Sequence, residues 1–394
     1  MEYRIDPKTG NRLSILGFGM MRLPRGITGT DQEKVTAMVG QAVESGVNYF
    51  DTAFVYPGSE VATGRALAET GFRDKIFLAT KLPHQQVRKT EDLDRIFAEQ
   101  LKRLQTDRID YYLMHNLPSV TLWQRLVERG VIDWLAAKQA DGFIGQVGFS
   151  FHGKQVDFLE LLEAFDWGFC QMQYNYLDVN YQAGQTGLKT AAERGMMVVI
   201  MEPLRGGKLA VGLPAKAESA FKAAEPGVSI ASWGLRWIWD QPEPTVVLSG
   251  MGTMEQLTDN LATAATANPG MLSQAQHDLI KRAIDIIEAG YKVPCTACNY
   301  CMPCPHGVNI PDCFTAYNTR ATQGLIAGMS QYFSGVGMPN PDRYSGPDKC
   351  QACGTCERKC PQNIAIIDSL KEVKKHMEPF WTKAVKLGVR IMMG

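Results

Sequence analysis

The run VNYFD at residues 47–51 is a short stretch of β-forming residues that ends on a carboxylate, and the pattern recurs along the chain. IFLATK at 76–81 ends on a lysine, and IDYYLMH at 109–115 ends on a histidine. Further runs of this kind are ILGFG (15–19), IGQVGFS (144–150), FCQMQYN (169–175), MVVIME (197–202) and TVVLSG (245–250). Short β-rich runs that alternate with longer segments are typical of repeated βα units around a parallel sheet.

Amphipathic segments separate these runs. DQEKVTAMVGQAVESG at 31–46 and TEDLDRIFAEQLKRL at 90–104 carry apolar residues at helical spacing and present polar outer faces. Eight βα units are the number that closes a (β/α)8 barrel. We therefore predict an α/β fold with a TIM barrel over residues 1–270.

The chain is longer than one barrel requires. It has 394 residues, whereas such a barrel takes roughly 250. Residues 271–290 have a helical pattern closed by Gly290, after which the composition shifts to Cys, Pro and Gly. We predict a linker helix over 271–294 and a small, mainly helical domain with a C-terminal helix over 295–394.

The net charge and the hydropathy of the chain indicate which classes of partner it binds. Lysines plus arginines number 41, as do the acidic residues, so no charge excess favours a nucleic acid or an anionic membrane surface. We expect a small-molecule or protein partner. No apolar run reaches the roughly 18 residues of a membrane span and the N-terminus has no apolar run, so we predict no span and a cytoplasmic location.

The cysteines are concentrated near the C-terminus. Nine of the ten lie between 295 and 360, which favours reduced thiolates that hold metal over a disulfide framework. Bacterial two-cluster ferredoxins use C-x2-C-x2-C-x3-C-P, in which the fourth cysteine ligates the other cluster. CQACGTCERKCP at 350–361 matches this pattern fully, and CTACNYCMPCP at 295–305 is one residue short in its last gap.

Two 4Fe-4S clusters are therefore predicted in a ferredoxin-like domain. One is held by Cys295, Cys298, Cys301 and Cys360, and the other by Cys350, Cys353, Cys356 and Cys304. Structural zinc, which also uses C-x2-C pairs, is the main alternative. Cys313 is left over and is expected to be a buried thiol, while Cys170 falls in a barrel strand and is expected in the core.

Four polar residues follow successive barrel strands, where the chemistry of such barrels is located. They are Asp51, Tyr56, Lys81 and His115. A tyrosine has a pKa of about 10 and donates a proton poorly at neutral pH, but a nearby ammonium lowers that value. We expect Lys81 to tune Tyr56, Asp51 to orient Lys81, and the histidine to polarise a substrate carbonyl.

Several motifs resemble the aldo-keto reductase superfamily over residues 14–265: FDTAFVYPGSE (50–60), ATK (79–81), LMHN (113–116) and QMQYN (171–175). The resemblance implies that the four residues form the family's catalytic tetrad, with Tyr56 as general acid while a reduced nicotinamide gives hydride to a carbonyl. It also implies that Ser150 and Gln173 hold the nicotinamide carboxamide. The tail, with MEPLRGG (201–207) and GFSFHG (148–153), is similar to the subgroup that carries a C-terminal ferredoxin-like domain.

Two positions depart from the family pattern. Phe151 stands where the family usually has an asparagine, and Met201 stands where an aromatic residue usually stacks on the nicotinamide.

Phosphate binding in such barrels uses the loops after strands seven and eight and a helix N-terminus. The candidates here are Arg205, Gly206, Gly207, Lys208, Ser249, Gly250, Gly252, Thr253, Gln256 and Asn260. The last loop offers Glu255 and Asp259 but no cation for a 2′-phosphate, which slightly favours NADH over NADPH. A flavin phosphate is an alternative occupant.

Electron counting leaves three functions open. A nicotinamide gives two electrons as hydride, whereas a 4Fe-4S cluster carries one, so exchange between them needs a converter such as a flavin. The first function is carbonyl reduction or alcohol oxidation with an auxiliary tail. The second is a flavin- or ferredoxin-linked redox enzyme, whose partner is an external ferredoxin or another redox protein. The third is a non-catalytic electron-transfer subunit, against which the intact tetrad argues.

Overall fold

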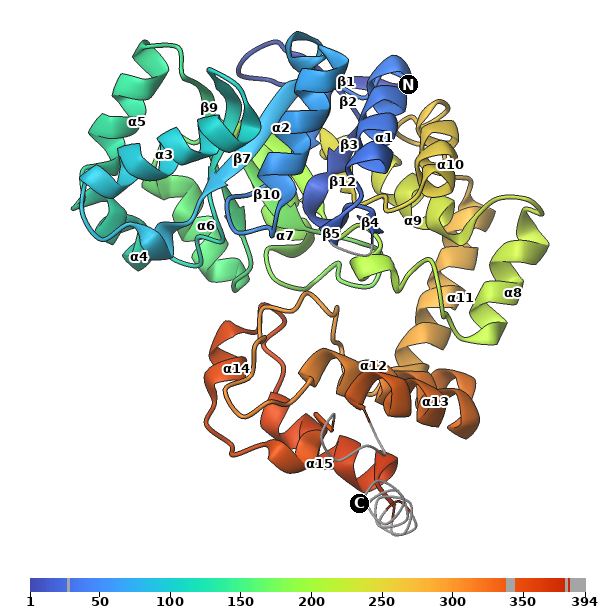
Figure 1. Cartoon of the computed structure of the whole chain (residues 1–394). Helices are drawn as coiled ribbons and strands as arrows, with labels where there is room; N and C mark the ends of the chain where they lie inside the picture. Colours follow the sequence, from blue (N-terminus) through green and yellow to red (C-terminus); the bar gives the residue numbers. More distant parts are fainter. Residues whose placement is uncertain (27–28, 338–343, 380–381, 383–394) are drawn as a thin grey trace. The chain divides into compact units, whose positions relative to one another are not determined.

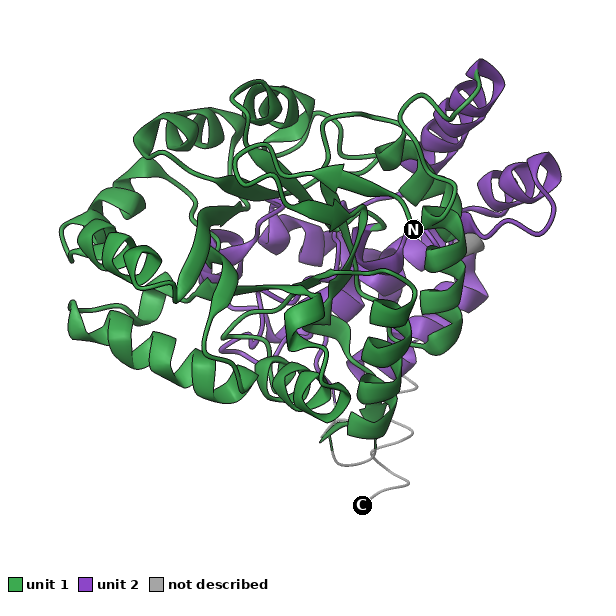
Figure 2. Cartoon of the chain, turned by 90° about the horizontal axis from the view of Figure 1, so that it is seen from above, with its two compact units in different colours: residues 1–204, 231–273 green, residues 205–230, 274–394 purple. Residues whose placement is uncertain are grey.

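The computed structural model describes residues 1–26, 29–337, 344–379 and 382. The chain divides into two compact units (Figure 2). The barrel unit consists of residues 1–204 and 231–273, and the cysteine unit consists of residues 205–230 and 274–394. The segment 205–230 therefore belongs with the cysteines, although it lies between two barrel strands in the sequence.

A closed parallel barrel of eight strands confirms the predicted (β/α)8 fold. The strands pair in the order β10-β11-β12-β3-β6-β7-β8-β9. Their bounds are β3 Leu16–Gly19, β6 Tyr49–Asp51, β7 Phe77–Leu82, β8 Ile109–Met114, β9 Ile144–Phe151, β10 Phe169–Gln173, β11 Met197–Met201 and β12 Val246–Ser249. Each lies within one residue of a predicted run or inside it.

Helices surround this sheet (Figure 1). In the barrel unit they are α1 Gln32–Glu44, α2 Ser59–Thr70, α3 Glu91–Leu104, α4 Val120–Val127, α5 Val131–Ala140, α6 Gln155–Ala164, α7 Gly184–Glu193, α9 Ile230–Trp239 and α10 Met254–Ala264. Two hairpins, β1 Tyr3–Ile5 with β2 Arg12–Ser14 and β4 Arg25–Gly26 with β5 Gly29–Thr30, complete the unit.

Side chains alternate between the two faces of each strand and so form two hydrophobic cores, one inside the barrel and one between the sheet and the helices. Inward-facing side chains such as Tyr49, Tyr111 and Phe169 fill the barrel, with the Tyr49 and Tyr111 ring centroids 5.4 Å apart. The other strand faces pack against the helices. Further along the same inward faces stand Asp51 and Lys81, because side chains repeat with a period of two. The packed interior thus supports the polar end of the barrel.

One glycine shows how closely the helices pack. A Cβ added to Gly64 in α2 would lie 2.4 Å from the carbonyl oxygen of Arg103 at the end of α3. This distance is far below van der Waals contact, so only glycine allows the two helices to approach this closely.

The cysteine unit is helical, as predicted. Its helices are α8 Ala215–Ala224, α11 Gln274–Gly290, α12 Ile310–Gln323, α13 Leu325–Val336, α14 Thr355–Lys359 and α15 Ile366–Met377. Phe314, Tyr332 and Val373 lie in its buried core. The continuation of the predicted C-terminal helix over 380–381 and 383–394 lies outside the described residues.

The segment 205–230 is tied to the rest of the cysteine unit by side-chain contacts. Gln276 in α11 donates a hydrogen bond of 2.6 Å to Glu225 after α8. A Cβ on Gly290 would lie 3.0 Å from Thr322 and 3.6 Å from Pro214, so α11, α12 and the start of α8 meet closely. Within the residues that the structure describes, no helix has the length and apolar character needed to cross a bilayer.

Candidate functional site

The four predicted catalytic residues meet at the C-terminal ends of adjacent strands. Asp51 is the last residue of β6, Lys81 lies next to the end of β7, and His115 directly follows β8. Tyr56 lies in the loop between β6 and α2. Strand pairing of β6 with β7 and of β7 with β8 brings these ends together.

A buried ion pair forms the base of this group. The Lys81 ammonium donates to both Asp51 carboxylate oxygens, at 2.6 and 2.7 Å, and to the Thr52 carbonyl at 2.7 Å. Both side chains are almost fully buried. Burial raises the pKa of Asp51, and the ammonium opposes that rise. Burial likewise lowers the pKa of Lys81, and the carboxylate opposes that fall.

Tyr56 lies above this pair and is the only half-exposed member of the four. The Lys81 nitrogen is 5.1 Å from the centroid of the Tyr56 ring. The His115 ring meets the Tyr56 ring edge to face, with centroids 5.8 Å apart. The tyrosine thus has a cation on one side, an imidazole on another, and access to solvent for a substrate.

His115 is held in its neutral form. Burial lowers its pKa well below the usual 6.5, and the Lys81 charge and the neighbouring His152 and His84 lower it further. The Nδ1 atom of His84 lies 2.7 Å from the His115 carbonyl oxygen. The Nδ1 atom of His152 lies 3.1 Å from the Gln182 side-chain oxygen, and burial lowers the pKa of His152 to about 4.

Neither His84 nor His152 was identified from the sequence. His152 follows Ser150 by two residues at the end of the fifth barrel strand, and that position was the available signal. His84 follows β7 by two residues. Both histidines therefore lie within electrostatic range of His115.

The two predicted carboxamide-binding residues both have protein partners. Ser150 accepts a hydrogen bond of 2.8 Å from the backbone N–H of Asn116. The Gln173 amide donates 2.7 Å to the Asp178 carboxylate. The other predicted contact on this side, Met201, ends β11, and its sulfur lies 3.7 Å from the amide nitrogen of Gln171.

Gln171 is a site residue that the sequence analysis missed. It pairs in register with Ser150, is buried, and hydrogen-bonds to the Asp51 side chain. Its side-chain oxygen is buried without a protein partner. It lies two residues before Gln173 on one strand, so the two side chains share the inward face, and this spacing was the missed signal.

The loop after β12 forms a compact turn at the start of α10. Asn260 donates 2.8 Å to the Ser249 hydroxyl, and the Thr253 hydroxyl caps the helix by accepting from the N–H of Gln256. The Gly252 N–H donates to the side chain of Gln256. A Cβ on Gly250 would lie 3.7 Å from the Cβ of Arg22, which places a cation that was not predicted beside these glycines.

The four predicted phosphate ligands after β11 fall in the cysteine unit. Arg205 is buried and donates 3.2 Å to the carbonyl of Pro294, the residue before Cys295. Lys208 donates 3.2 Å to the Thr315 hydroxyl in α12. Between them, Gly206 and Gly207 adopt positive φ values of 68° and 93°, which glycine tolerates best. Arg205 thus contacts the residue that precedes the first cysteine run, and Lys208 contacts α12.

Four of the predicted cluster ligands line one cavity. They are Cys295, Cys298, Cys301 and Cys360, and the apolar side chains of Ile310, Phe314 and Ile366 complete its wall. Burial raises the pKa of the Cys301 thiol to about 12, and the other three sulfurs raise it as well. A metal centre would relieve that repulsion, so the donor set fits a bound cluster.

The two cysteine runs have the same local geometry. Ala297 and Ala352 stand two residues after Cys295 and Cys350, and both adopt left-handed φ values, 56° and 53°. Each donates its N–H to the sulfur two residues earlier, at 3.4 and 3.5 Å. Left-handed alanines cost of order 1–3 kcal/mol each, so a repeated instance indicates a function for the bend.

The second set of thiols is more open. Cys356 is buried and lies within electrostatic range of Cys304, whereas Cys353 is exposed. Among the described residues, no three His, Cys, Asp or Glu side chains are grouped so as to hold a single metal ion. Cys313 and Cys170 are fully buried in the two cores, where burial raises the pKa of both thiols.

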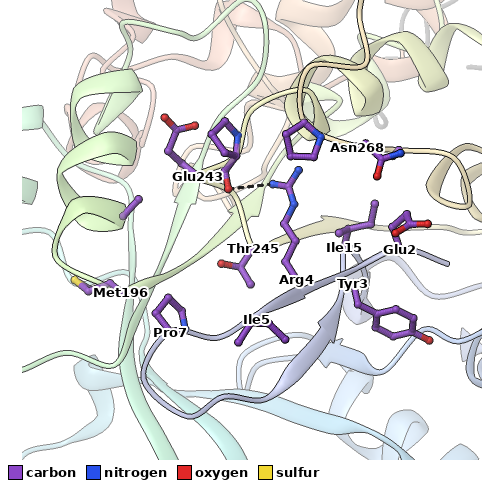
Figure 3. A pocket seen from close by; sticks show the side chains of 14 residues that line it. Glu2, Tyr3, Arg4, Ile5, Pro7, Ile15, Met196, Glu243, Thr245 and Asn268 are labelled. Atoms are coloured by element: carbon purple, nitrogen blue, oxygen red, sulfur yellow. Dashed lines mark hydrogen bonds between the residues drawn. The ribbon is translucent and has the colours of Figure 1, made fainter.

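A separate hollow lies at the opposite, N-terminal end of the barrel strands (Figure 3). Arg4 crosses it and donates to the carbonyls of Trp239 and Gln241 at 2.6 and 2.8 Å, and to that of Pro244. Burial lowers the pKa of Arg4 to about 10, and Glu243 opposes that change. The guanidinium thus binds the carbonyl group at the C-terminal end of α9. Because the hollow lies at the N-terminal ends of the barrel strands and the tetrad lies at their C-terminal ends, the two sites are distinct.

Comparison with known proteins agrees with this geometry. Residues 15–285 match the model of the aldo/keto reductase family, and residues 294–365 match that of the 4Fe-4S dicluster domain. An uncharacterized oxidoreductase of Bacillus subtilis (strain 168), YrpG, is 26% identical over 66% of this chain and 90% of its own length. The L-galactose dehydrogenase of Arabidopsis thaliana is 27% identical over 66% of this chain and 88% of its own.

Solved structures match the barrel part of the chain. A holo aldo-keto reductase from Bacillus halodurans aligns with a TM-score of 0.59 and 25% identity, covering 72% of this chain and 96% of its own. An aldo/keto reductase from Klebsiella pneumoniae, in complex with NADP and acetate, shares the fold at a TM-score of 0.58 and 21% identity, with 72% and 95% covered. Since the family match spans more than half of the chain and includes all eight barrel strands, this oxidoreductase chain belongs to the aldo/keto reductase family and carries a 4Fe-4S dicluster domain after its barrel.

Proposed function

We propose that the chain reduces the carbonyl group of a small molecule, or oxidises the corresponding alcohol, with Tyr56 as the general acid of the reduction. One observation carries this proposal. The half-exposed Tyr56 ring lies 5.1 Å from an ammonium that is itself held by a buried carboxylate. That arrangement stabilises the negative charge a phenol acquires when it gives up its proton.

Each of the four side chains has a separate task. Tyr56 gives its proton to the carbonyl oxygen, and the Lys81 ammonium stabilises the phenolate that remains. Asp51 and the Thr52 carbonyl fix the lysine. His115, kept neutral by burial and by Lys81, is free to donate a hydrogen bond to the same carbonyl oxygen. A reduced nicotinamide, when bound, supplies the hydride.

The residues for that nicotinamide are the predicted ones together with Gln171. Ser150 and Gln171 lie opposite each other on β9 and β10, with Gln173 two residues further along, and these polar groups suit a carboxamide. The α10 N-terminus and the glycines before it suit a phosphate. Glu255 and Asp259 disfavour a 2′-phosphate there, whereas Arg22 beside Gly250 is a cation that would favour one, so NADH is only slightly preferred and NADPH or a flavin are the alternatives.

We further propose two 4Fe-4S clusters with the predicted ligand sets. The cavity lined by Cys295, Cys298, Cys301 and Cys360 supports the first set. The equivalent N–H to sulfur contacts in the two runs, and the proximity of Cys304 to Cys356, support the second. The ten cysteines, all within the described residues, form no disulfide, which is typical of a reducing compartment and supports a cytoplasmic location.

A second function is favoured by the exposed Cys353. A buried cluster that only stabilises the fold needs no ligand at the surface, whereas an electron carrier benefits from one. In this function the clusters exchange electrons with an external redox protein, and a flavin links them to the barrel.

The main proposal is tested with Tyr56→Phe. We expect NAD(P)H-dependent reduction of carbonyl compounds to fall by about 10²–10⁴-fold, the usual contribution of a general acid, while iron content stays unchanged. Tyr3→Phe is the matched control, because Tyr3 donates to the Gly46 carbonyl at the other end of the barrel. Retained turnover in Tyr56→Phe would remove Tyr56 from the acid role.

An anaerobic titration of the iron-loaded protein with NADH and then NADPH distinguishes the two functions. If electron paramagnetic resonance shows reduced clusters growing with nucleotide, the barrel and the clusters form one electron path and a converter is required. If nucleotide binds and the clusters remain oxidised, the carbonyl reductase with an auxiliary domain holds.

A further inference from the structure

The two cysteine runs differ in how they meet solvent. In the second run, Gln351, Ala352 and Cys353 form a continuous exposed stretch. In the first run the equivalent cysteine, Cys298, is only half exposed, and its group of four encloses a cavity with an apolar wall. If both runs hold clusters, the second one comes nearest to the surface of its unit.

Cations flank this exposed stretch. Arg358 folds back over the turn, with its Nη1 atom 3.2 Å from the position of a Cβ on Gly354, and it donates to the Thr355 hydroxyl. The Lys349 side chain lies beside Gly307, three residues after Cys304, with its ammonium 3.9 Å from a Cβ built there. Lys359 is exposed in the same short helix as Arg358.

These three cations are not neutralised within the described residues. No ion pair there includes Lys349, Arg358 or Lys359. Among the nearby acids, Asp348 pairs with Lys374 and Asp368 pairs with Lys371, while Glu357 accepts from the N–H of Ile367 and keeps its charge, which leaves three cations against one carboxylate. The surface around Cys353 is therefore basic.

The first run has fewer basic side chains of its own. Between residues 291 and 307 the only basic side chains are Lys292 and His306, and no acidic one is present. Both runs would carry the same type of cluster, so the charge difference is not a general requirement of cluster binding. The charge difference therefore indicates that the second run has a role in binding another molecule that the first run does not share.

We propose that the basic surface formed by Lys349, Arg358 and Lys359 around Cys353 docks an acidic one-electron carrier protein. The inference rests on the cluster assignment proposed above, not on the carbonyl chemistry. In the transfer, the reduced carrier loses one electron and the cluster held by Cys350, Cys353, Cys356 and Cys304 gains it, with no atom exchanged. Opposite charge steers and orients the encounter, and salt screens it.

The test uses the full chain loaded with iron and sulfide, and an acidic 2Fe-2S ferredoxin as the probe. The triple variant Lys349→Glu, Arg358→Glu, Lys359→Glu is compared with the control triple Arg125→Glu, Lys189→Glu, Lys216→Glu, whose residues are exposed on other helices. Binding of oxidised ferredoxin is measured by calorimetry, and electron transfer from reduced ferredoxin by anaerobic stopped flow.

We expect the surface triple to weaken binding and slow transfer at least tenfold at low salt, and the control triple to stay within twofold of the parent. The difference should shrink as salt rises. Equal binding in both triples overturns the proposal, and so does a slowed transfer with unchanged binding, because the cations would then act on the cluster potential. If the triple variant loses iron, the same measurements are repeated with the single variant Lys349→Glu, because Lys349 lies outside the helix that carries Cys356. A parent chain that binds no iron refutes the cluster assignment itself, while Tyr56-dependent turnover would still be measurable.

Discussion

The polar site of the barrel and the cavity of the cysteine unit achieve order in opposite ways. At the barrel rim, Lys81 is satisfied by Asp51 and the Thr52 carbonyl, all supplied by the protein. In the cysteine unit, Cys301 faces three other sulfurs that raise its pKa, and left-handed alanines hold the loops. The first site is complete as folded, whereas the second brings four thiols to one cavity whose donor set suits a metal centre.

The largest effect is expected from the removal of one cluster ligand. Cys360→Ser should abolish one of the two clusters, lowering iron content by about half, and disorder the loop of 295–304, because metal binding contributes directly to folding. Unfolding of the barrel, followed by tryptophan fluorescence, should be unchanged. Cys313→Ala is the control, since this buried thiol lies in the core and is not a proposed ligand.

Equal loss of iron in Cys313→Ala would contradict the predicted ligand sets. So would full retention of iron in Cys360→Ser. The first result would make Cys313 as important to the clusters as Cys360, and the second would remove Cys360 from the ligands.

Breaking the ion pair of the barrel should have a smaller effect on folding. Lys81→Met leaves Asp51 as a buried, uncompensated charge, which we expect to cost about 3–5 kcal/mol of unfolding free energy while iron content stays constant. Adding Asp51→Asn should restore much of the stability and none of the activity. Denaturant titration of the single and double variants measures both. If the double variant recovers no stability, the loss in Lys81→Met does not come from an uncompensated charge on Asp51.

The smallest effect comes from pH. Burial lowers the pKa of His115, His84 and His152, the last to about 4. The unfolded chain binds these protons near the ordinary pKa of about 6.5, so stability rises with pH below that value and is lost as pH falls. Each such histidine should contribute about 1.4 kcal/mol per pH unit between its folded pKa and 6.5.

His152→Asn should remove one such contribution from the slope of barrel stability between pH 6.5 and 5.5. His306→Asn, which changes an exposed ring in the cysteine unit and not in the barrel, is the control. A slope that is the same in both variants would mean that His152 is already protonated in the folded barrel.

Much of this fold could be predicted from the sequence. The eight barrel strands follow the predicted runs because each is a compact β-rich stretch between amphipathic helices, a local signal. The four tetrad positions could be placed on one rim because strand ends of a closed parallel barrel are fixed by the fold. The cysteine runs likewise carry their spacing in the sequence.

The residues that were missed depend on contacts between distant segments. Gln171 matters through Asp51, which lies on a strand far away in sequence, and Arg22 lies beside Gly250 only after the barrel closes. The segment 205–230 was expected to belong to the barrel because it lies between two barrel strands. Its association with α11 and α12 depends on contacts such as Lys208 with Thr315, which span about a hundred positions and leave no local pattern.

The cysteine unit is built from two separate segments of the sequence, and this affects the order in which its parts are synthesised. The segment 205–230 leaves the ribosome well before the cysteine runs with which it packs. At roughly 5–20 residues per second, it waits on the order of ten seconds for Cys360. During that interval the residues of the cysteine unit that pack against Arg205 and α8 have not yet been synthesised. We therefore expect a chaperone to bind this segment. For the same reason, a tail transferred alone to another barrel would lack the segment 205–230 with which it packs.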